Sequence, residues 1–374
     1  MKKQNLTPEI TFDDVLLLPG YSTFEMNDDV KKVSLKTRVS KNLTIDIPIT
    51  SSPMPGLTEE NMAIAIGKLG GLGFIHPFQS KAKQLAQLKK VKKHKVKVAV
   101  SVVDLSLGKG IDHVKKVYKA GADMVCVETS HAHNKQTIEF IKKIKKINPK
   151  IEVCASLVVT GKATEALIKA GADSIRVGIG GGSHCTTRLV TGVGRPQLSA
   201  VEECYKVAKK YNVPIISDTG IKYAGDITKA LVFGGESVMI GGLLTGTDEC
   251  PGEIIEKKGK KYKHSWGMCT REAITHNQPF FKNPYKFTLR KIKKIIKIIL
   301  GIKQSQQKEE FIFEEGVGEL IPYKGSVDSV VEDLVSGIKR SMWYLGVSNI
   351  SQLQKKTKWV TTSSNTNLEN IPRI

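Results

Sequence analysis

The chain of 374 residues is 40% apolar and carries 58 Lys and Arg, 36 Asp and Glu, 33 Gly and 6 Cys. These proportions exclude a disordered, collagen-like or disulfide-stapled protein, and no uncharged apolar stretch is long enough for a signal peptide or a membrane span. The formal net charge of +22 is spread along the chain with few aromatic residues, so we expect a cytoplasmic protein that binds an anionic small molecule rather than nucleic acid.

Eight short, mostly apolar runs alternate with charged stretches that have helical periodicity. The runs span residues 45–52, 71–76, 97–104, 122–130, 151–159, 172–180, 213–220 and 236–245. The helical stretches span residues 58–69, 81–91, 111–120, 135–147, 160–170, 197–211, 226–233 and 326–345. Most runs follow one another at roughly 25 residues, which suits one strand plus one crossover helix, and runs that are apolar on both faces are typical of a buried parallel sheet. The sequence therefore predicts an α/β fold, a (β/α)8 TIM barrel forming a single catalytic domain over residues 1–360, with a doubly wound open sheet as the alternative.

Two connections are longer than the others, at residues 180–197 and 247–325. Long loops in a compact domain usually serve as lids or binding elements, so we expect a lid insertion at 275–314 before the last helix. Within it, residues 288–302 have a basic amphipathic pattern, which predicts an ordinary lid helix with a solvated lysine face; the alternatives are a helix that covers an anionic site or one that contacts an anionic membrane. The polar residues 361–374 are expected to form a flexible tail.

The glycine-rich run 178–188 follows the sixth predicted strand and contains Cys185. Glycines let backbone groups approach an ion closely, and the chemistry of a barrel lies at the carboxyl ends of its strands. Arg188 supplies a nearby cation, which favours the thiolate form of a cysteine, so Cys185 is a candidate nucleophile. A buried structural cysteine is the alternative.

Other polar residues fall at the ends of other predicted strands. Gly241 and Gly242 follow the eighth strand, where barrels commonly hold a phosphate group. Asp218, after the seventh, can accept hydrogen bonds from ribose hydroxyls or cap a helix, and Glu128, after the fourth, can bind a ribose, act as a base or form an ion pair. Histidines also fall near strand ends, but no set of acidic ligands accompanies them, so metal catalysis is not expected. They are His76, His131, His133 and His184.

The stretch IRVGIGGGSHCTTR at 175–188 closely resembles the signature of the IMP dehydrogenase/GMP reductase family. Further similar stretches are TFDDVLLLPGYS (11–22), SSPM (51–54), GGLGFIH (70–76), GDITKAL (225–231), VMIGGLL (238–244) and YKGSV (323–327). The resemblance covers about residues 8–360. It implies a barrel, a purine nucleoside monophosphate (GMP or IMP) as substrate, and chemistry at C2 of the purine through a thioimidate bound to a cysteine.

The same resemblance implies roles for individual residues. Cys185 would be the nucleophile, Thr187 its partner in proton transfer and Glu315 the acid that contacts the purine edge. The residues expected to bind the substrate are Ser52, Met54, Ser183, Asp218, Gly220, Gly241, Gly242, Met268 and Cys269. Those expected on the nicotinamide side, for NADPH or NAD, are Glu128, Thr129 and Ser130. The family also implies a homotetramer and a potassium ion held by backbone carbonyls of Gly180, Gly182 and Cys185.

Two features favour GMP reductase, which converts GMP and NADPH to IMP, ammonia and NADP. Residues 81–97 run on without the regulatory domain pair that many dehydrogenases insert there, and residues 275–314 lack the Arg-Tyr pair with which dehydrogenases activate water. IMP dehydrogenase, which converts IMP, NAD and water to XMP and NADH, is the alternative. A diverged, non-catalytic barrel that binds nucleotides or membranes is the second alternative. Departures from the family pattern near the expected ligand sites are Pro55, Gly56, Pro77, Leu157 in place of Asn, and Thr219 in place of Gly.

Overall fold

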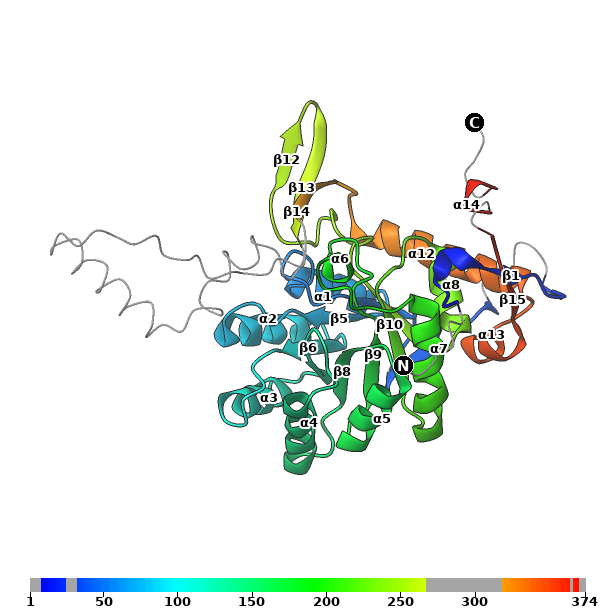
Figure 1. Cartoon of the computed structure of the whole chain (residues 1–374). Helices are drawn as coiled ribbons and strands as arrows, with labels where there is room; N and C mark the ends of the chain where they lie inside the picture. The colour runs from blue at the N-terminus through cyan, green and yellow to red at the C-terminus, as the bar shows by residue number, and fades with distance from the viewer. Residues whose placement is uncertain (1–7, 25–31, 267–317, 364–365, 370–374) are drawn as a thin grey trace, which may run out of the picture.

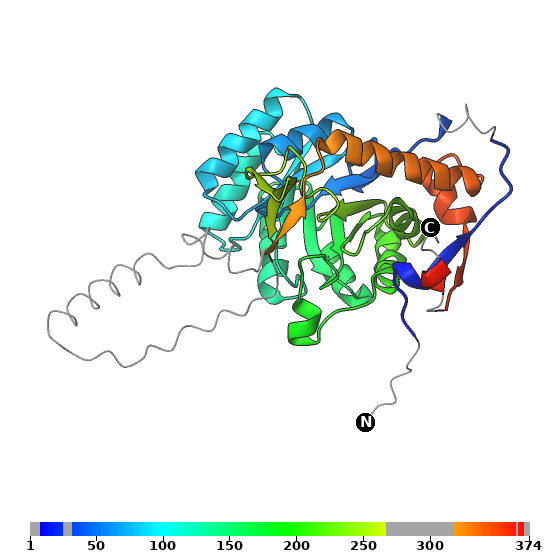
Figure 2. The same ribbon diagram turned by 90° about the horizontal axis from the view of Figure 1, so that it is seen from above.

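The centre of the molecule is a barrel of eight parallel strands that closes on itself (Figures 1 and 2). The computed structural model describes residues 8–24, 32–266, 318–363 and 366–369. In chain order the barrel strands are β4 (Ile49–Ser51), β5 (Leu72–Ile75), β6 (Val98–Val102), β7 (Met124–Val127), β8 (Val153–Val158), β9 (Ser174–Val177), β10 (Ile215–Asp218) and β11 (Ser237–Ile240). Each strand lies within one of the eight predicted runs, and β11 pairs with β4 to complete the ring. The predicted (β/α)8 barrel is therefore confirmed.

Helices surround the barrel (Figure 2). They are α1 (Glu60–Lys68), α2 (Lys81–Lys93), α3 (Lys109–Lys119), α4 (Lys135–Ile147), α5 (Gly161–Ala170), α7 (Gln197–Ala208) with the short η3 (Lys209–Tyr211), α8 (Ala224–Val232) and α12 (Val327–Tyr344). Polar side chains cap their first turns: Ser80 accepts from the amide of Lys83, and Thr160 accepts from that of Ala163. Within the described ranges, no helix combines the length and the apolar character needed to cross a lipid bilayer.

Apolar side chains fill the interior of the barrel. They belong to one cluster of buried residues: Leu72, Phe74, Ala99, Met124, Cys126, Cys154, Ile216 and Met239. A hairpin of β2 (Thr37–Ser40) and β3 (Leu43–Ile45) adds Val39 and Ile45 to this cluster. The hairpin contacts the residue that precedes β11, since the hydroxyl of Thr37 donates to the carbonyl of Glu236. It thus closes the end of the barrel at which the strands begin, and the opposite end is available for binding and chemistry.

A three-stranded antiparallel sheet lies in the connection that the sequence predicted to be a loop, 247–325, so that prediction was wrong for this part. It consists of β12 (Ile254–Lys257), β13 (Lys260–Trp266) and β14 (Gly318–Pro322), and it projects from the barrel (Figure 1). Lys258 and Gly259, with φ of 52° and 71°, form the two-residue turn between the first two strands. The many lysines in this stretch obscure the alternation of apolar and polar residues that would have predicted strands.

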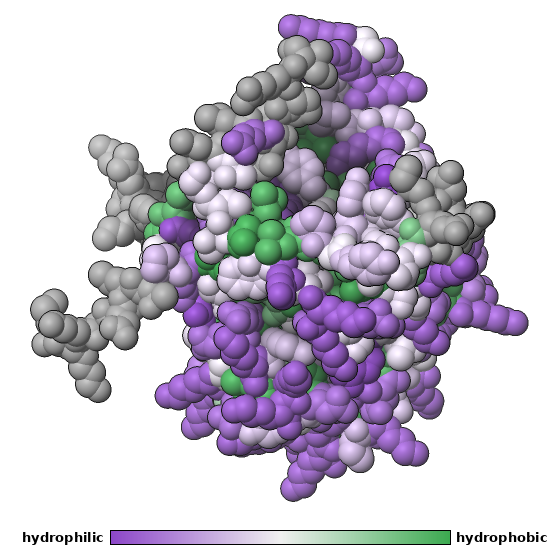
Figure 3. Space-filling view, turned by 90° about the vertical axis from the view of Figure 1, so that its right-hand side faces the viewer, coloured by the Kyte–Doolittle hydropathy of each residue, from purple (hydrophilic) through white to green (hydrophobic). Residues whose placement is uncertain are grey.

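The two ends of the described chain meet in a two-stranded ribbon outside the barrel. The ribbon consists of β1 (Val15–Leu18) and β15 (Lys358–Thr361). The helices next to these strands in the chain are η1 (Phe12–Asp14), α13 (Ile350–Lys356) and α14 (Thr366–Glu369). β1 and β15 pair antiparallel, and the amide of Thr362 donates to the carbonyl of Asp14. Part of the stretch expected to be a tail is therefore hydrogen-bonded to the N-terminal segment. Figure 3 views this side, where apolar side chains lie among hydrophilic ones; Leu16, Leu18 and Val360 are 40%, 40% and 42% exposed.

Candidate active site

The predicted site residues gather at one rim of the barrel because the carboxyl ends of parallel strands meet there. The residues of this rim that the structure describes are Ser52, Met54, Glu128, Thr129, Ser130, Gly180, Gly182, Ser183, Cys185, Thr187, Asp218, Gly220, Gly241 and Gly242. They follow or end β4, β7, β9, β10 and β11. Met268, Cys269 and Glu315 lie outside the described residues, as do the predicted insertion 275–314 and its basic stretch 288–302.

Cys185 lies in the loop after β9, next to a hydroxyl group. Its Sγ is 3.1 Å from Oγ1 of Thr187, the first residue of α6 (Thr187–Thr191), a distance at which a thiol and a hydroxyl can exchange a proton. Cys185 is partly exposed, whereas the other described cysteines are buried; these are Cys126, Cys154, Cys204 and Cys250. Burial raises the pKa of the Cys204 thiol to about 12. Among the described thiols, Cys185 is therefore the one best placed to act as a nucleophile.

Arg188 holds the cysteine loop by binding its backbone. Its Nε donates to the carbonyl of Ile179 at 3.0 Å, and its Nη2 donates to the carbonyl of Arg195. Gly180 has a φ of +74°, and a Cβ there would lie 2.5 Å from Cγ of Arg188, so glycine is what permits this approach. The sequence suggested that Arg188 acts as a cation beside the thiol, whereas these contacts assign its guanidinium to the loop.

Three loops of the rim meet around a pair of glycines. A Cβ on Gly242 would lie 2.5 Å from Oγ of Ser183, and one on Gly241 would lie 3.2 Å from Sδ of Met54 and 3.8 Å from Cβ of Ser52. Lys324 was not predicted as a site residue; its Nζ donates to the carbonyls of Gly242 and Leu243 at 3.2 and 2.9 Å. Its place in the YKGSV stretch (323–327), which resembles the family, could have pointed to it. Small residues, hydroxyls and a lysine side chain together make a suitable place for a phosphate group.

A buried ionic cluster lies beneath this rim and was not predicted. Arg176 of β9 is 1% exposed, and its Nε and Nη2 donate to Oδ2 of Asp218 at 3.1 and 2.6 Å. Its Nη1 donates to Oε2 of Glu128 at 2.5 Å and contacts Sγ of Cys126 at 3.3 Å. Because side chains alternate along a strand, Arg176 faces the barrel interior, where Glu128 and Asp218 converge on it. A single arginine in an otherwise apolar run was the available signal.

Glu128 is both an ion-pair partner and a potential ligand-binding group. Burial raises the pKa of its carboxyl group, while the contact with Arg176 opposes this shift. Oε1 of Glu128 is buried and has no hydrogen-bond partner among the described residues. Such an atom can accept a hydrogen bond from a hydroxyl group of a bound molecule, which is compatible with the predicted place of Glu128 on the nicotinamide side.

The neighbours of Glu128 complete this side of the rim. The amide of Thr129 donates to Oγ of Ser156 at 3.1 Å, its hydroxyl donates to the carbonyl of His131 at 3.4 Å, and Ser130 is exposed. Of the expected cation ligands, the carbonyl of Gly182 already accepts a hydrogen bond from the amide of Cys185 at 3.0 Å.

The four histidines near strand ends occupy separate surroundings. His76 lies 3.4 Å from Oε1 of Glu59, and His184 lies 3.1 Å from Oγ of Ser183 and 4.0 Å from Oε1 of Glu319 in β14. The rings of His131 and His133 form an edge-to-face pair at 6.3 Å. In the parts of the chain that the structure describes, no three His, Cys, Asp or Glu side chains are arranged to hold a metal ion.

Two departures from the family pattern occupy left-handed backbone conformations. Leu157 in β8 has a φ of 58°, and Thr219 after β10 has a φ of 95°. Asn and Gly, the residues that the resemblance led us to expect at these positions, adopt positive φ with little cost, whereas branched side chains do so only under strain. Leu157 and Thr219 therefore hold backbone conformations that suit the expected Asn and Gly better than they suit Leu and Thr.

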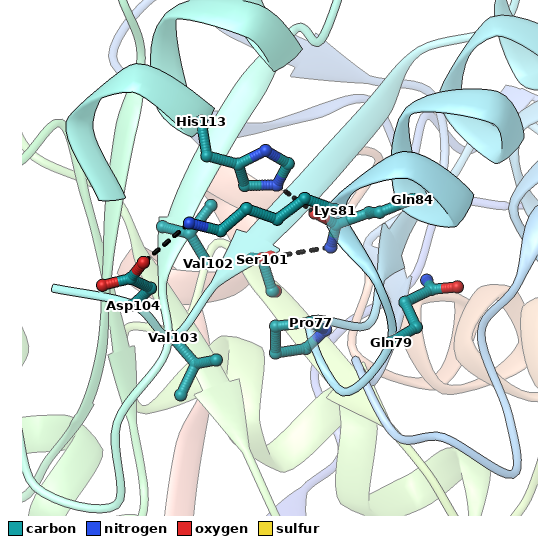
Figure 4. Close-up of a pocket in the computed structure, with 9 residues that line it drawn as sticks. All are labelled: Pro77, Gln79, Lys81, Gln84, Ser101, Val102, Val103, Asp104 and His113. Atoms are coloured by element: carbon teal, nitrogen blue, oxygen red, sulfur yellow. Dashed lines mark hydrogen bonds and ion pairs between the residues drawn. The ribbon is translucent and has the colours of Figure 1, made fainter. Parts of the chain in front are cut away.

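Pro77, another departure, borders a small cavity of about 10 Å³ at the ends of β5 and β6 (Figure 4). In this cavity Nε2 of His113 lies 2.6 Å from Oε1 of Gln84, whose amide nitrogen donates to the carbonyl of Ser101, and Lys81 pairs with Asp104 (Figure 4). Burial, followed by the charges of nearby lysines, lowers the pKa of His113 to about 4.

We expect His113 to make the stability of the protein depend on pH. Its pKa is lower in the folded state than in the unfolded chain, so its contribution is complete above about pH 6.5 and is lost as the pH falls toward 4. Burying a neutral His113 should therefore cost the folded state about 2 kcal/mol at pH 5. Between pH 7 and pH 5 the melting temperature should therefore fall further for wild-type than for His113→Gln. The exposed His94→Gln is the control, and equal pH slopes in all three proteins would contradict the assignment.

Comparison with known proteins places this geometry in a family. The chain matches the IMP dehydrogenase / GMP reductase domain over residues 9–373. It is 35% identical to the inosine-5'-monophosphate dehydrogenase of Cryptosporidium parvum over 407 positions, which cover 97% of this chain and 95% of that protein. It is 33% identical to the enzyme of the same name from Borreliella burgdorferi over 411 positions (97% and 96%) and 30% identical to that from Aquifex aeolicus over 477 positions (94% and 92%).

The match extends along nearly the whole chain and includes the barrel, the cysteine loop and the glycine pair of the rim. The family resemblance that the sequence suggested is thereby confirmed. The chain belongs to the IMP dehydrogenase/GMP reductase family and is an NAD(P)-dependent oxidoreductase of that family.

Proposed function

We propose that the chain is an IMP dehydrogenase, which oxidises IMP to XMP with NAD as the oxidant and water as the oxygen source. The observation that carries this choice is the identity with relatives that bear this name, over 94 to 97% of the chain in the three cases above. The sequence alone favoured GMP reductase, and the comparisons give better support to its alternative.

The missing regulatory domain pair does not argue against a dehydrogenase. α2 ends at Lys93 and β6 begins at Val98, so no domain is inserted between them. The Cryptosporidium and Borreliella relatives are covered to 95 and 96% by alignments of 407 and 411 positions, whereas the Aquifex alignment takes 477. Relatives of both lengths carry the same name. GMP reductase remains the second candidate, because residues 275–314 contain no Arg-Tyr pair.

In the proposed reaction the Sγ of Cys185 adds to C2 of IMP, and the thiol proton leaves through the hydroxyl of Thr187, 3.1 Å away. Bound NAD supplies the acceptor for the hydride that leaves C2. The purine is then attached to Sγ through C2 as a thioimidate. Attack of water at C2 releases XMP and restores the thiol. We assign the activation of this water to a residue outside the described part of the chain, where Glu315 also lies.

The remaining rim residues bind and orient the substrate in this proposal. The phosphate group lies against the backbone of Gly241 and Gly242 and the hydroxyls of Ser52 and Ser183, with the charge of Lys324 nearby. Both hydrogen bonds from Arg176 go to Oδ2 of Asp218, so we assign Oδ1 to the ribose hydroxyls of IMP. Glu128, Thr129 and Ser130 are assigned to the nicotinamide ribose.

Absorbance at 340 nm tests the proposal with purified protein in two mixtures, IMP with NAD and GMP with NADPH. We expect a rise in the first mixture and no change in the second. A fall in the second mixture alone would make the chain a GMP reductase, and unchanged absorbance in both mixtures would favour a non-catalytic barrel.

Running each mixture in potassium and in sodium buffer tests the predicted cation site. Light scattering of the same sample tests the predicted homotetramer.

A further inference from the structure

The loop that carries Cys185 is packed tightly against the loop after β10. A Cβ on Gly178 would lie 1.8 Å from the carbonyl oxygen of Asp218, and a Cβ on Gly181 would lie 2.6 Å from Oγ1 of Thr219. The two loops therefore touch at two points, and at the second point the contact is made by a side chain. That side chain belongs to one of the departures from the family pattern.

Thr219 occupies this place at a cost in backbone conformation. Its φ of 95° lies in a region that β-branched residues rarely adopt. Strained residues persist only where the surroundings hold them, and they concentrate at sites where position is part of the function. The hydroxyl of Thr219 donates to Oε1 of Gln197 at 3.3 Å. Gln197 is 2% exposed, and its amide nitrogen donates to the carbonyl of Val177 and to Oγ of Ser217.

These contacts lead directly to the reactive thiol. Gly181 precedes Gly182, whose carbonyl accepts the hydrogen bond from the amide of Cys185 at 3.0 Å. A shift of Gly181 would therefore be transmitted through one short turn to Cys185. On the other side, Thr219 is anchored through Gln197 to the ends of β9 and β10.

We propose that Thr219 is a positioning residue: its side chain fills the space left by the absent Cβ of Gly181 and holds the loop so that Cys185 points at the substrate. Thr219 and Gly181 then form a size-matched pair, in which bulk on one residue requires its absence on the other. The kinetic part of this inference rests on the proposed function, while the structural pairing does not.

A double-mutant cycle tests the pairing with wild-type, Thr219→Gly, Gly181→Ala and the double variant Gly181→Ala/Thr219→Gly. Thr219→Gly removes the strain but opens a gap, so we expect an undiminished melting temperature together with a kcat about tenfold lower and a KM for IMP nearly unchanged. Gly181→Ala forces the loops apart and should also lower kcat about tenfold. In the double variant the new methyl group refills the gap, and kcat should return to within about threefold of wild-type.

Thr219→Ser serves as the conservative variant, because it keeps the hydroxyl next to Gly181 and should retain most of the activity. Lys258→Gly is the matched control, because it relieves a positive φ of 52° in the turn between β12 and β13 and should leave kcat unchanged. If Gly181→Ala does not fold, the comparison of Thr219→Gly with Thr219→Ser still decides. Equal activity of these two variants, or a loss in the double variant equal to the product of the single losses, would overturn the proposal.

The rate at which iodoacetamide alkylates Cys185, followed by mass spectrometry of its peptide from about pH 6.5 to about pH 10, a range that brackets an ordinary thiol pKa of about 8.5, provides a readout without substrate. The two single variants should shift the rate or its pH midpoint, and the double variant should restore both. If wild-type converts neither IMP nor GMP, the proposed function fails, yet this labelling cycle still supports or refutes the pairing. Identical labelling profiles in all four proteins would refute it.

Discussion

A Cys185→Ser variant is expected to lose turnover of IMP by roughly 10⁴-fold or more, since removal of a covalent nucleophile eliminates the reaction path that depends on it. A serine hydroxyl is a far weaker nucleophile than a thiol near neutral pH because its pKa is much higher. The rim residues that we assign to phosphate and ribose are unchanged, so binding of IMP, measured by calorimetry, should remain within a few-fold of wild-type.

Cys204→Ala is the matched control for this variant. The Cys204 thiol is buried in α7, and burial raises its pKa to about 12, so its loss should leave the chemical step unaffected. Both variants should show wild-type circular dichroism. Turnover by Cys185→Ser within tenfold of wild-type would remove Cys185 from the mechanism, whichever of the two reactions the chain performs.

An Arg176→Met variant is expected to lose about 3–5 kcal/mol of the free energy of unfolding, which is typical when one partner of a buried ion pair is removed. Arg176 is 1% exposed and is hydrogen-bonded to both Glu128 and Asp218. Methionine fills similar space but leaves two carboxylates close together without a counter-charge. Urea unfolding at pH 7.5 measures the loss.

The loss should depend on pH in a defined direction. Burial raises the pKa of Glu128 in the folded state, so its stabilising contribution is complete below the unfolded value of about 4.5 and is lost as the pH rises through the folded pKa. Removing Arg176 raises that pKa further. The difference in stability between wild-type and Arg176→Met should therefore be smaller at pH 5.5 than at pH 8.

Arg38→Met is the matched control for the buried arginine. Arg38 pairs with Glu236 at 2.8 Å, but its side chain is 30% exposed, so this variant should lose about 1 kcal/mol or less. A loss in Arg176→Met no greater than that in Arg38→Met, or a loss independent of pH, would contradict the account of the cluster.

The barrel and the cysteine loop were predictable because both depend on local patterns. Eight buried parallel strands, each followed by a crossover helix, produce apolar runs at regular spacing, and the glycines around Cys185 form one continuous stretch. The glycine pair Gly241 and Gly242 could be placed beside that loop because the fold brings all strand ends to one rim.

The contacts that were missed join residues far apart in the sequence. The convergence of Glu128 and Asp218 on Arg176 depends on which side chains face the interior of a closed barrel, and one arginine in a strand does not disclose its partners. The pairing of Thr219 with Gly181 depends on a positive φ that the sequence pattern does not report. In β12 to β14 the abundance of lysine obscured a hairpin.

The choice between the two reactions shows a different limit. The absence of an inserted domain pair favoured a reductase. However, two relatives named inosine-5'-monophosphate dehydrogenase align over 95 and 96% of their length in 407 and 411 positions, only slightly more than the 374 residues of this chain. Presence or absence of a regulatory insertion does not change the residues at the rim, so it carries little information about the chemistry that those residues perform.

We expect the thiol of Cys185 to form a covalent bond to C2 of a purine nucleotide during turnover. The most direct measurement is to mix the protein with IMP and NAD, quench with acid during steady state, digest, and map the attached nucleotide by mass spectrometry. We predict that the nucleotide is carried by the peptide that contains Cys185. A nucleotide attached to a peptide with any of the other five cysteines, or NADH formation with all six thiols unmodified throughout, would contradict the account.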